Sequence, residues 1–80
     1  MLARVYITLK AGVLDPAGKA VETSLHTLGF PEVASVRLGK YVELQLPEGD
    51  QASARARVEE MCKRLLANTV VENYRVELSG

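Results

Sequence analysis

The sequence has few of the residues on which catalytic and metal sites depend. Among its 80 residues there are one cysteine, Cys62, and one histidine, His26. A single cysteine excludes an intrachain disulfide and a cysteine-rich zinc site. His26 lies on the polar face of a predicted helix, four residues after Glu22, where a solvated role is expected. Cys62 falls within an apolar helical stripe, which predicts inert packing rather than a reactive thiol.

An excess of charge of either sign is also missing. Ten Lys and Arg residues balance ten Asp and Glu residues, so the formal net charge is zero. This balance argues against a nucleic-acid partner and against binding to an anionic membrane. Apolar runs stay well short of the ~18 residues that a membrane-spanning helix needs. With no secretory signal pattern at the N-terminus, we expect a cytoplasmic protein.

The length of the chain, by contrast, makes a positive prediction. Eighty residues are expected to form a single domain, residues 1–80. A domain of this size buries only about 60% of the surface that its unfolded chain exposes, so its core has little stability to spare. We therefore expect a homo-oligomer, a dimer or higher.

Alternation of apolar and polar residues predicts the strands. Residues 4–9 and 73–78 each alternate with a period of two, as expected of strands buried on one face. Two further alternating runs flank Gly39-Lys40, and a glycine in a two-residue connection supplies the positive φ of a tight turn. A β-hairpin is therefore predicted over residues 33–46.

Capping residues and helical spacing predict two helices. Asp15-Pro16 begins the first helix, which ends before Gly29. Asp50 caps the second, which runs from Gln51 to about Ala67, where Asn68 is expected to end it in left-handed geometry. The apolar stripe of the first helix is Ala17, Val21, Leu25 and Leu28, and that of the second is Ala54, Val58, Met61, Cys62 and Leu65.

The order of these elements predicts an α+β fold. Strand, helix, strand, strand, helix, strand is the order of a ferredoxin-like βαββαβ sandwich, with a four-stranded antiparallel sheet and two helices on one face. The other face carries two tyrosines and matched charges, so it is a candidate subunit interface. Its residues are Arg4, Tyr6, Thr8, Arg37, Tyr41, Glu43, Arg75 and Glu77.

Other proteins of this architecture need residues that the chain does not supply. A small phosphate-handling enzyme needs a glycine-rich cradle with an arginine after the first strand, and residues 10–14 hold one glycine and no arginine. An RNA-recognition module needs more aromatic side chains on the sheet than Tyr6 and Tyr41. We predict no catalytic, cofactor-binding or metal-binding residue. A stand-alone module that senses a small molecule stays open as the alternative function.

Three motifs, taken together, carry a family resemblance. They are residues 13–18 (VLDPAG), residues 36–41 (VRLGKY), and Met61-Cys62 followed by residues 65–74 (LLANTVVENY). In this order and spacing they resemble PurS, the small subunit of phosphoribosylformylglycinamidine synthase. The similarity extends from about Val5 to Glu77. Asn73 departs from the pattern, since an acidic residue is common before the tyrosine.

The resemblance implies a part in de novo purine synthesis. The synthase converts formylglycinamide ribonucleotide, glutamine and ATP to formylglycinamidine ribonucleotide, glutamate, ADP and phosphate. In this family a large synthetase subunit uses ATP and magnesium and a glutaminase subunit releases ammonia. The small subunit, itself non-catalytic, bridges the two for ammonia transfer.

The motifs also carry candidate contact residues. Arg37, Lys40, Tyr41 and Tyr74 match the family's motifs and are candidate contacts with partner subunits. The first three flank the predicted turn, where we expect their side chains to point outward. Gly39 and Asn68 match as well, but backbone freedom and helix capping account for them.

Overall fold

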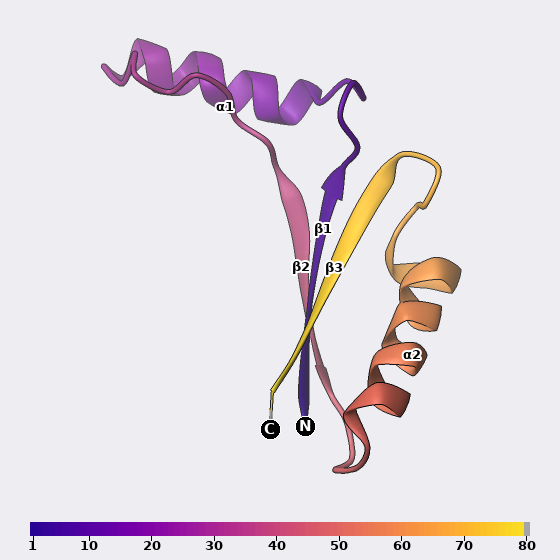
Figure 1. Cartoon of the computed structure of the whole chain (residues 1–80). Coiled ribbons are helices and arrows are strands. Elements are labelled where there is room, and N and C mark those ends of the chain that lie inside the picture. Colours follow the sequence, from indigo (N-terminus) through magenta and orange to yellow (C-terminus); the bar gives the residue numbers. More distant parts are fainter. Residues whose placement is uncertain (80) are drawn as a thin grey trace.

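The computed structural model describes residues 1–79 and confirms an α+β fold with an antiparallel sheet (Figure 1). The strand β1 lies in the centre of a three-stranded sheet of order β2-β1-β3. Both helices begin where predicted, because Asp15 and Asp50 accept hydrogen bonds from the N–H groups of Gly18 and Ser53. The elements in chain order are β1 (Leu2–Leu9), α1 (Pro16–Thr27), β2 (Gly39–Gln45), α2 (Gln51–Met61), the π-helical turn η1 (Cys62–Leu66) and β3 (Glu72–Ser79).

The predicted hairpin is wrong, and with it the fourth strand. Residues 33–38 form no strand, and the sheet of the described residues has three strands rather than four. Gly39 does not have a positive φ; it begins β2 opposite Thr8. The chain runs on past Gly39 without turning back (Figure 1).

The positions of the apolar residues explain why the chain does not form a hairpin at Gly39. In a two-residue turn over Gly39-Lys40, Leu38 and Tyr41 would pair and share one face of the sheet. Leu38 and Val42 would then lie on opposite faces, although both are apolar. The even-numbered apolar residues on either side of Gly39 share one face when the chain continues straight, as it does here.

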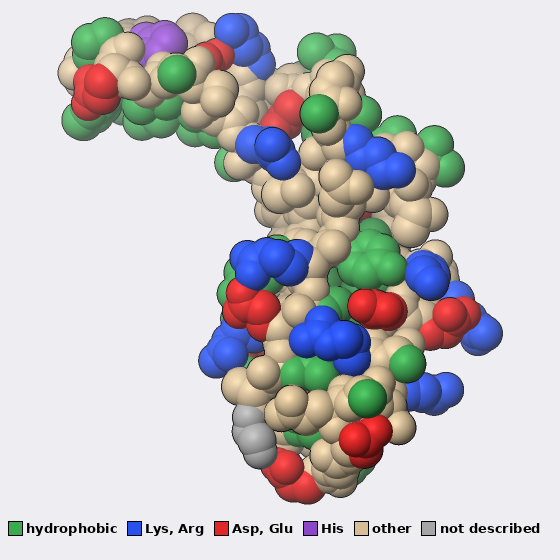
Figure 2. All heavy atoms as spheres, in the orientation of Figure 1, with side chains coloured by type: hydrophobic (Ala, Val, Ile, Leu, Met, Phe, Trp, Pro, Cys, Tyr) green, Lys and Arg blue, Asp and Glu red, His purple; other side chains and the backbone are tan. Residues whose placement is uncertain are grey.

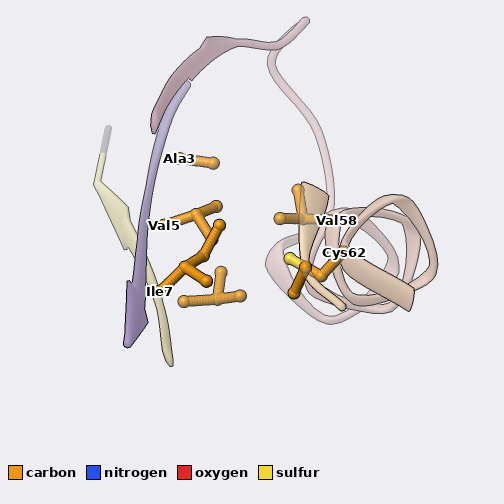
Figure 3. Close-up of a cluster of buried hydrophobic side chains, with 7 residues drawn as sticks. Ala3, Val5, Ile7, Val58 and Cys62 are labelled. Carbon is orange, nitrogen blue, oxygen red and sulfur yellow. The ribbon is translucent and has the colours of Figure 1, made fainter. Parts of the chain in front are cut away.

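The hydrophobic core lies between β1 and α2. Ala3, Val5 and Ile7 point from β1 toward Val58 and Cys62, and all five are fully buried (Figure 3). The predicted packing role of Cys62 is confirmed. Burial, with a smaller effect of the nearby Glu59 carboxylate, raises the pKa of the Cys62 thiol, so the group stays neutral.

The π-helical turn changes which leucine at the end of α2 is buried. Leu65, predicted to belong to the apolar stripe, is 83% exposed, whereas Leu66 packs against the core. The N–H of Ala67 donates to the carbonyl of Cys62, five residues back, at 2.9 Å. This wider turn rotates the side chains that follow it, so α-helical spacing no longer predicts which of them faces the core.

Helix α1 does not cover the sheet, so the prediction of two helices on one sheet face is wrong for the single chain. The extensive contacts join β1 to both neighbouring strands and α2 to η1 and β3, and α1 has none of comparable extent. Together with the return segment, residues 30–38, α1 forms an arm that extends from one end of the sheet (Figure 1).

The arm packs on itself rather than on the sheet. His26 Nε2 lies 2.7 Å from the carbonyl of Val33 in the return segment. The buried residues of α1 are Gly18 and Glu22, not those of the predicted stripe. The radius of gyration, 15.9 Å, exceeds the value of about 12 Å expected for a compact chain of this length. No helix within residues 1–79 has the length and apolar character needed to cross a membrane.

Candidate subunit interface

The sheet face opposite α2 is an ordered aromatic and charged surface, here called the tyrosine face. Tyr6 and Tyr41 lie opposite each other on β1 and β2, with ring centroids 5.2 Å apart. The Arg75 guanidinium lies 4.3 Å from the centroid of the Tyr6 ring and pairs with Glu77. The face also carries Arg4, Thr8 and Glu43, so the strand register confirms the predicted composition except for Arg37, which lies outside the strands.

The contacts on the tyrosine face hold its side chains in place. The Tyr6 hydroxyl donates to the Glu77 carboxylate at 3.4 Å, and Arg4 donates to the Ser79 hydroxyl at 3.2 Å. A cation over an aromatic ring is stabilising at such a distance. A partner would therefore meet a preformed surface and would order few side chains on binding.

The four candidate contact residues do not form one patch. Arg37 reaches the tyrosine face, where it donates to the Thr8 hydroxyl at 3.4 Å, and Tyr41 on the same face is 50% exposed. Lys40 and Tyr74 both lie opposite Ile7, which points toward α2. The candidates are therefore divided between the two sides of the sheet.

Lys40 joins two segments of the fold, a role that was not expected of a residue in a predicted turn. Its Nζ donates to the carbonyl of Leu66 at 3.1 Å and lies 3.6 Å from the Glu72 carboxylate. Lys40 does not lie at a hairpin turn, because its side chain connects β2 with the end of η1 and the start of β3. The side chain is still 56% exposed, so a partner could reach it.

The loop after η1 is built on Asn68. Its side-chain oxygen accepts the N–H of Val70 at 3.1 Å, and its own N–H donates to the Glu72 carboxylate at 2.7 Å. The predicted left-handed cap is wrong, since no non-glycine residue within the described range has a positive φ. Leu65 and Val70 are more than three-quarters exposed here. Sequence analysis missed this apolar surface because the π-helical turn is not visible in the spacing.

The arm carries a second apolar surface. Val21, Leu28 and Phe30 are exposed on it by 37%, 72% and 47%, and Figure 2 shows hydrophobic side chains along one edge of α1. Glu22, by contrast, is buried. A hydrogen bond from Lys19, with Nζ 2.7 Å from the carboxylate, outweighs the cost of burial and lowers the pKa of Glu22. The apolar edge of α1 faces solvent in the single chain.

The described residues form open surface hollows and no cluster of metal-ligating side chains. An open hollow of about 360 Å³ lies between the β2–α2 turn and α2, lined mainly by Leu46, Pro47, Ala54 and Met61. Within residues 1–79 no three His, Cys, Asp or Glu side chains gather in a way that could hold a metal ion. The surfaces described above instead offer recognition of other protein surfaces.

Comparison with known proteins decides the family. The family model of PurS, described as phosphoribosylformylglycinamidine (FGAM) synthase, matches residues 2–80. The chain belongs to the PurS family. The PurS subunit of this synthase from Synechocystis sp. is 51% identical over 77 residues, which cover 96% of this chain and 77% of that one.

Solved PurS structures share the shape of the chain. A crystal structure of PurS from Bacillus subtilis, 47% identical, superposes with a TM-score of 0.87 over 99% of this chain and 98% of that one. A chain in the structure of PurLQS from Thermotoga maritima, 32% identical, has a TM-score of 0.82 over 96% of each chain. The superposition on the Bacillus subtilis structure covers 99% of this chain and so includes the residues of the arm.

Proposed function

We propose that this PurS chain is the small, non-catalytic subunit of an FGAM synthase and acts in the cytoplasm in de novo purine synthesis. The observation that carries the proposal is the match to PurS over residues 2–80, joined by the similarity to a chain of PurLQS. The synthase uses ATP and glutamine to convert formylglycinamide ribonucleotide to formylglycinamidine ribonucleotide. ATP and magnesium are bound by the large synthetase subunit, and this chain joins that subunit to the glutaminase for ammonia transfer.

The shape of the chain supports a bridging role. Its longest dimension is 48 Å, and its exposed apolar residues lie at separate places, on the arm and on the loop after η1. Exposed apolar clusters on a small protein indicate contacts with other proteins. Arg37 and Tyr41 on one side of the sheet, and Lys40 and Tyr74 on the other, are the proposed contact residues. Contacts on both sides suit a subunit that lies between other chains.

The test of the function is reconstitution with the large and glutaminase subunits of the same source. Formation of the amidine product is measured with glutamine and, separately, with ammonium chloride as the nitrogen donor. We expect glutamine-dependent synthesis to require this chain and ammonium-dependent synthesis to require it far less. The chain alone should hydrolyse neither ATP nor glutamine. Full glutamine-dependent activity without the chain would overturn the proposal.

The contact residues are tested by the affinity for the large subunit. Arg37→Ala and Tyr41→Ala should each weaken binding, because arginine and tyrosine in the centre of an interface can contribute ~2 kcal/mol or more. Lys63→Ala is the control, since Lys63 is exposed on the other side of the molecule from the tyrosine face. Lys40→Ala is less informative because it also removes the contact with Leu66. Undiminished affinity in both variants would place the contact elsewhere.

We also infer that the chain forms a homo-oligomer, a dimer or higher. Within residues 1–79 the single chain has three strands, and its arm makes no extensive contact with the sheet. A four-stranded ferredoxin-like arrangement then requires a strand from another copy.

A further inference from the structure

The arm leaves the sheet where the pairing of β1 with β2 ends, and little packing holds it there. Thr8 and Gly39 are the last opposite residues of the two strands at this end. Within residues 1–79 α1 makes no extensive contact with the sheet, and it extends away from the strands (Figure 1). An open hollow of about 500 Å³, lined in part by Val13 and Ser35, lies between the start of α1 and the return segment. Apolar packing therefore does not fix the direction of the arm.

One carboxylate joins the two ends of the arm at its base. Asp15 Oδ1 accepts the N–H of Gly18 at 2.9 Å and so caps α1, while Oδ2 accepts the N–H of Leu38 at 3.2 Å. Leu38 directly precedes β2, so the start of α1 is tied to the start of β2. Hydrogen bonds to an ionised acceptor are roughly twice as strong as those between neutral groups. The bond from Arg37 to the Thr8 hydroxyl, also at the base, is longer at 3.4 Å.

The residue at position 18 fits this link. Gly18 is buried, and its φ is not positive, so backbone freedom does not explain the glycine. A Cβ on Gly18 would overlap the Asp15 carboxylate and would lie 2.8 Å from the carbonyl of Val36 in the return segment. A glycine at position 18 therefore allows the first turn of α1, the carboxylate and the return segment to approach closely.

Helix capping alone does not account for the second oxygen of Asp15. Asp50 caps α2 through one oxygen, Oδ2, which accepts from the N–H and the hydroxyl of Ser53 at 2.9 and 3.0 Å. At Asp15 one oxygen serves the cap and the other reaches Leu38, 23 residues further along the chain. The two aspartates form a matched pair, because only one of them spans the arm.

We propose that Asp15 is a positioning residue whose link to Leu38 sets the direction of the arm, and that assembly of the synthase depends on this direction. The inference rests on the proposed function in so far as it takes the chain to bridge other subunits. A bridging chain must present the arm and the tyrosine face at a fixed angle to each other. If the arm takes several directions, the apparent affinity for its partners falls by the fraction of chains in the correct one.

Asp15→Asn separates the link from the cap. Asparagine is as good an N-cap as aspartate, but it has one accepting oxygen in place of two, so it cannot accept from both Gly18 and Leu38. Asp50→Asn is the control, since it makes the same change at a cap that uses one oxygen. We expect the helix content measured by circular dichroism to stay unchanged in both variants.

The direction of the arm is measured by pulsed electron paramagnetic resonance. Spin labels are attached to Glu32→Cys on the arm and Lys63→Cys on η1, both exposed positions, while Cys62 is fully buried. Labelled chains are diluted with unlabelled chains, so that distances within one chain are measured. We expect a single narrow distribution in the parent and in Asp50→Asn, and a broader or displaced one in Asp15→Asn. An unchanged distribution in Asp15→Asn would overturn the positioning role.

Titration of the chain into the reconstituted synthase tests the dependence of assembly. With Asp15→Asn, the concentration of chain that gives half of the maximal glutamine-dependent rate should rise about tenfold, because binding must select the correct direction of the arm. The maximal rate should be recovered at saturation, and Asp50→Asn should behave as the parent. A lower maximal rate with an unchanged half-saturating concentration would overturn this dependence.

Gly18→Ala tests the same link without changing the carboxylate. Alanine ordinarily stabilises a helix relative to glycine, so a loss of helix is not expected. Here the added Cβ displaces Asp15 and the return segment, and both the distances and the half-saturating concentration should change as in Asp15→Asn. An arm of unchanged direction in Gly18→Ala would contradict the proposal. If the chain proved dispensable for glutamine-dependent synthesis, the proposed function would fail, whereas the distances would still decide whether Asp15 sets the arm.

Discussion

At the scale of single residues, Gly39 is a glycine for a different reason from the one that its place in a predicted turn suggested. Gly39 does not have a positive φ, so backbone freedom does not explain it. A Cβ on Gly39 would overlap the carbonyl of Ile7 on the adjacent strand β1. The residue is small because two backbones approach closely there.

Gly39→Ala should therefore destabilise the protein, by about 1–3 kcal/mol, because the added methyl group forces β1 and β2 apart. The free energy of unfolding is measured by urea denaturation. Gly49→Ala is the matched control, since nothing lies within 4 Å of the Cβ position at Gly49. The control should change stability by no more than about 0.5 kcal/mol. Equal effects of the two variants would rule out the close approach as the cause.

Asp50 gives a prediction for pH. Its carboxylate accepts hydrogen bonds from the N–H and hydroxyl of Ser53, at 2.9 and 3.0 Å, and these bonds lower the pKa of Asp50. A carboxyl whose pKa is lowered on folding stabilises the protein fully above its unfolded pKa, and this stabilisation is lost as the pH falls through the folded pKa. Asp50→Asn should reduce the fall in stability below about pH 4, in urea titrations at stepped pH. Parallel curves for the two proteins would contradict this.

At the scale of elements, the π-helical turn η1 after α2 determines which of two neighbouring leucines is buried. Leu66→Ala should destabilise the protein by about 1–3 kcal/mol, because Leu66 packs against the core. Leu65→Ala removes the same atoms from a side chain that is 83% exposed and should stay within about 0.5 kcal/mol. Thermal and urea unfolding of the two variants compare them directly. A larger effect at Leu65 would mean that α2 continues as an ordinary α-helix.

Helix α1 shows the difference between forming an element and placing it. Its ends follow from Asp15, Pro16 and Gly29, and the structure has the helix where these residues predict it. The same residues do not predict which side of α1 is exposed. An apolar stripe indicates that one side of a helix packs against another surface, but it does not identify that surface.

At the scale of the whole molecule, folding and association should be coupled. Unfolding of a homo-oligomer releases separate chains, so the midpoint of thermal unfolding rises with protein concentration. We expect an increase of a few degrees over about a hundredfold range of concentration in scanning calorimetry. A midpoint that does not depend on concentration would mean that the single chain is the folding unit.

The sequence by itself determined the features that depend on neighbours in the chain. Strands β1 and β3, the caps Asp15 and Asp50, the composition of the tyrosine face and the membership of the PurS family all follow from local patterns or motifs. Local capping, alternation and motif spacing involve residues only a few positions apart, so they can be read without knowing the fold.

Only the tertiary structure decided how these parts meet. The straight course of the chain through Gly39, the projection of the arm, the burial of Leu66 instead of Leu65, and the turning of Lys40 toward Leu66 were not predicted. Each depends on contacts between segments far apart in the chain, or on the surface left for a second copy. An alternating pattern specifies that a strand needs a neighbour, but the same backbone groups accept a neighbour from their own chain or from another.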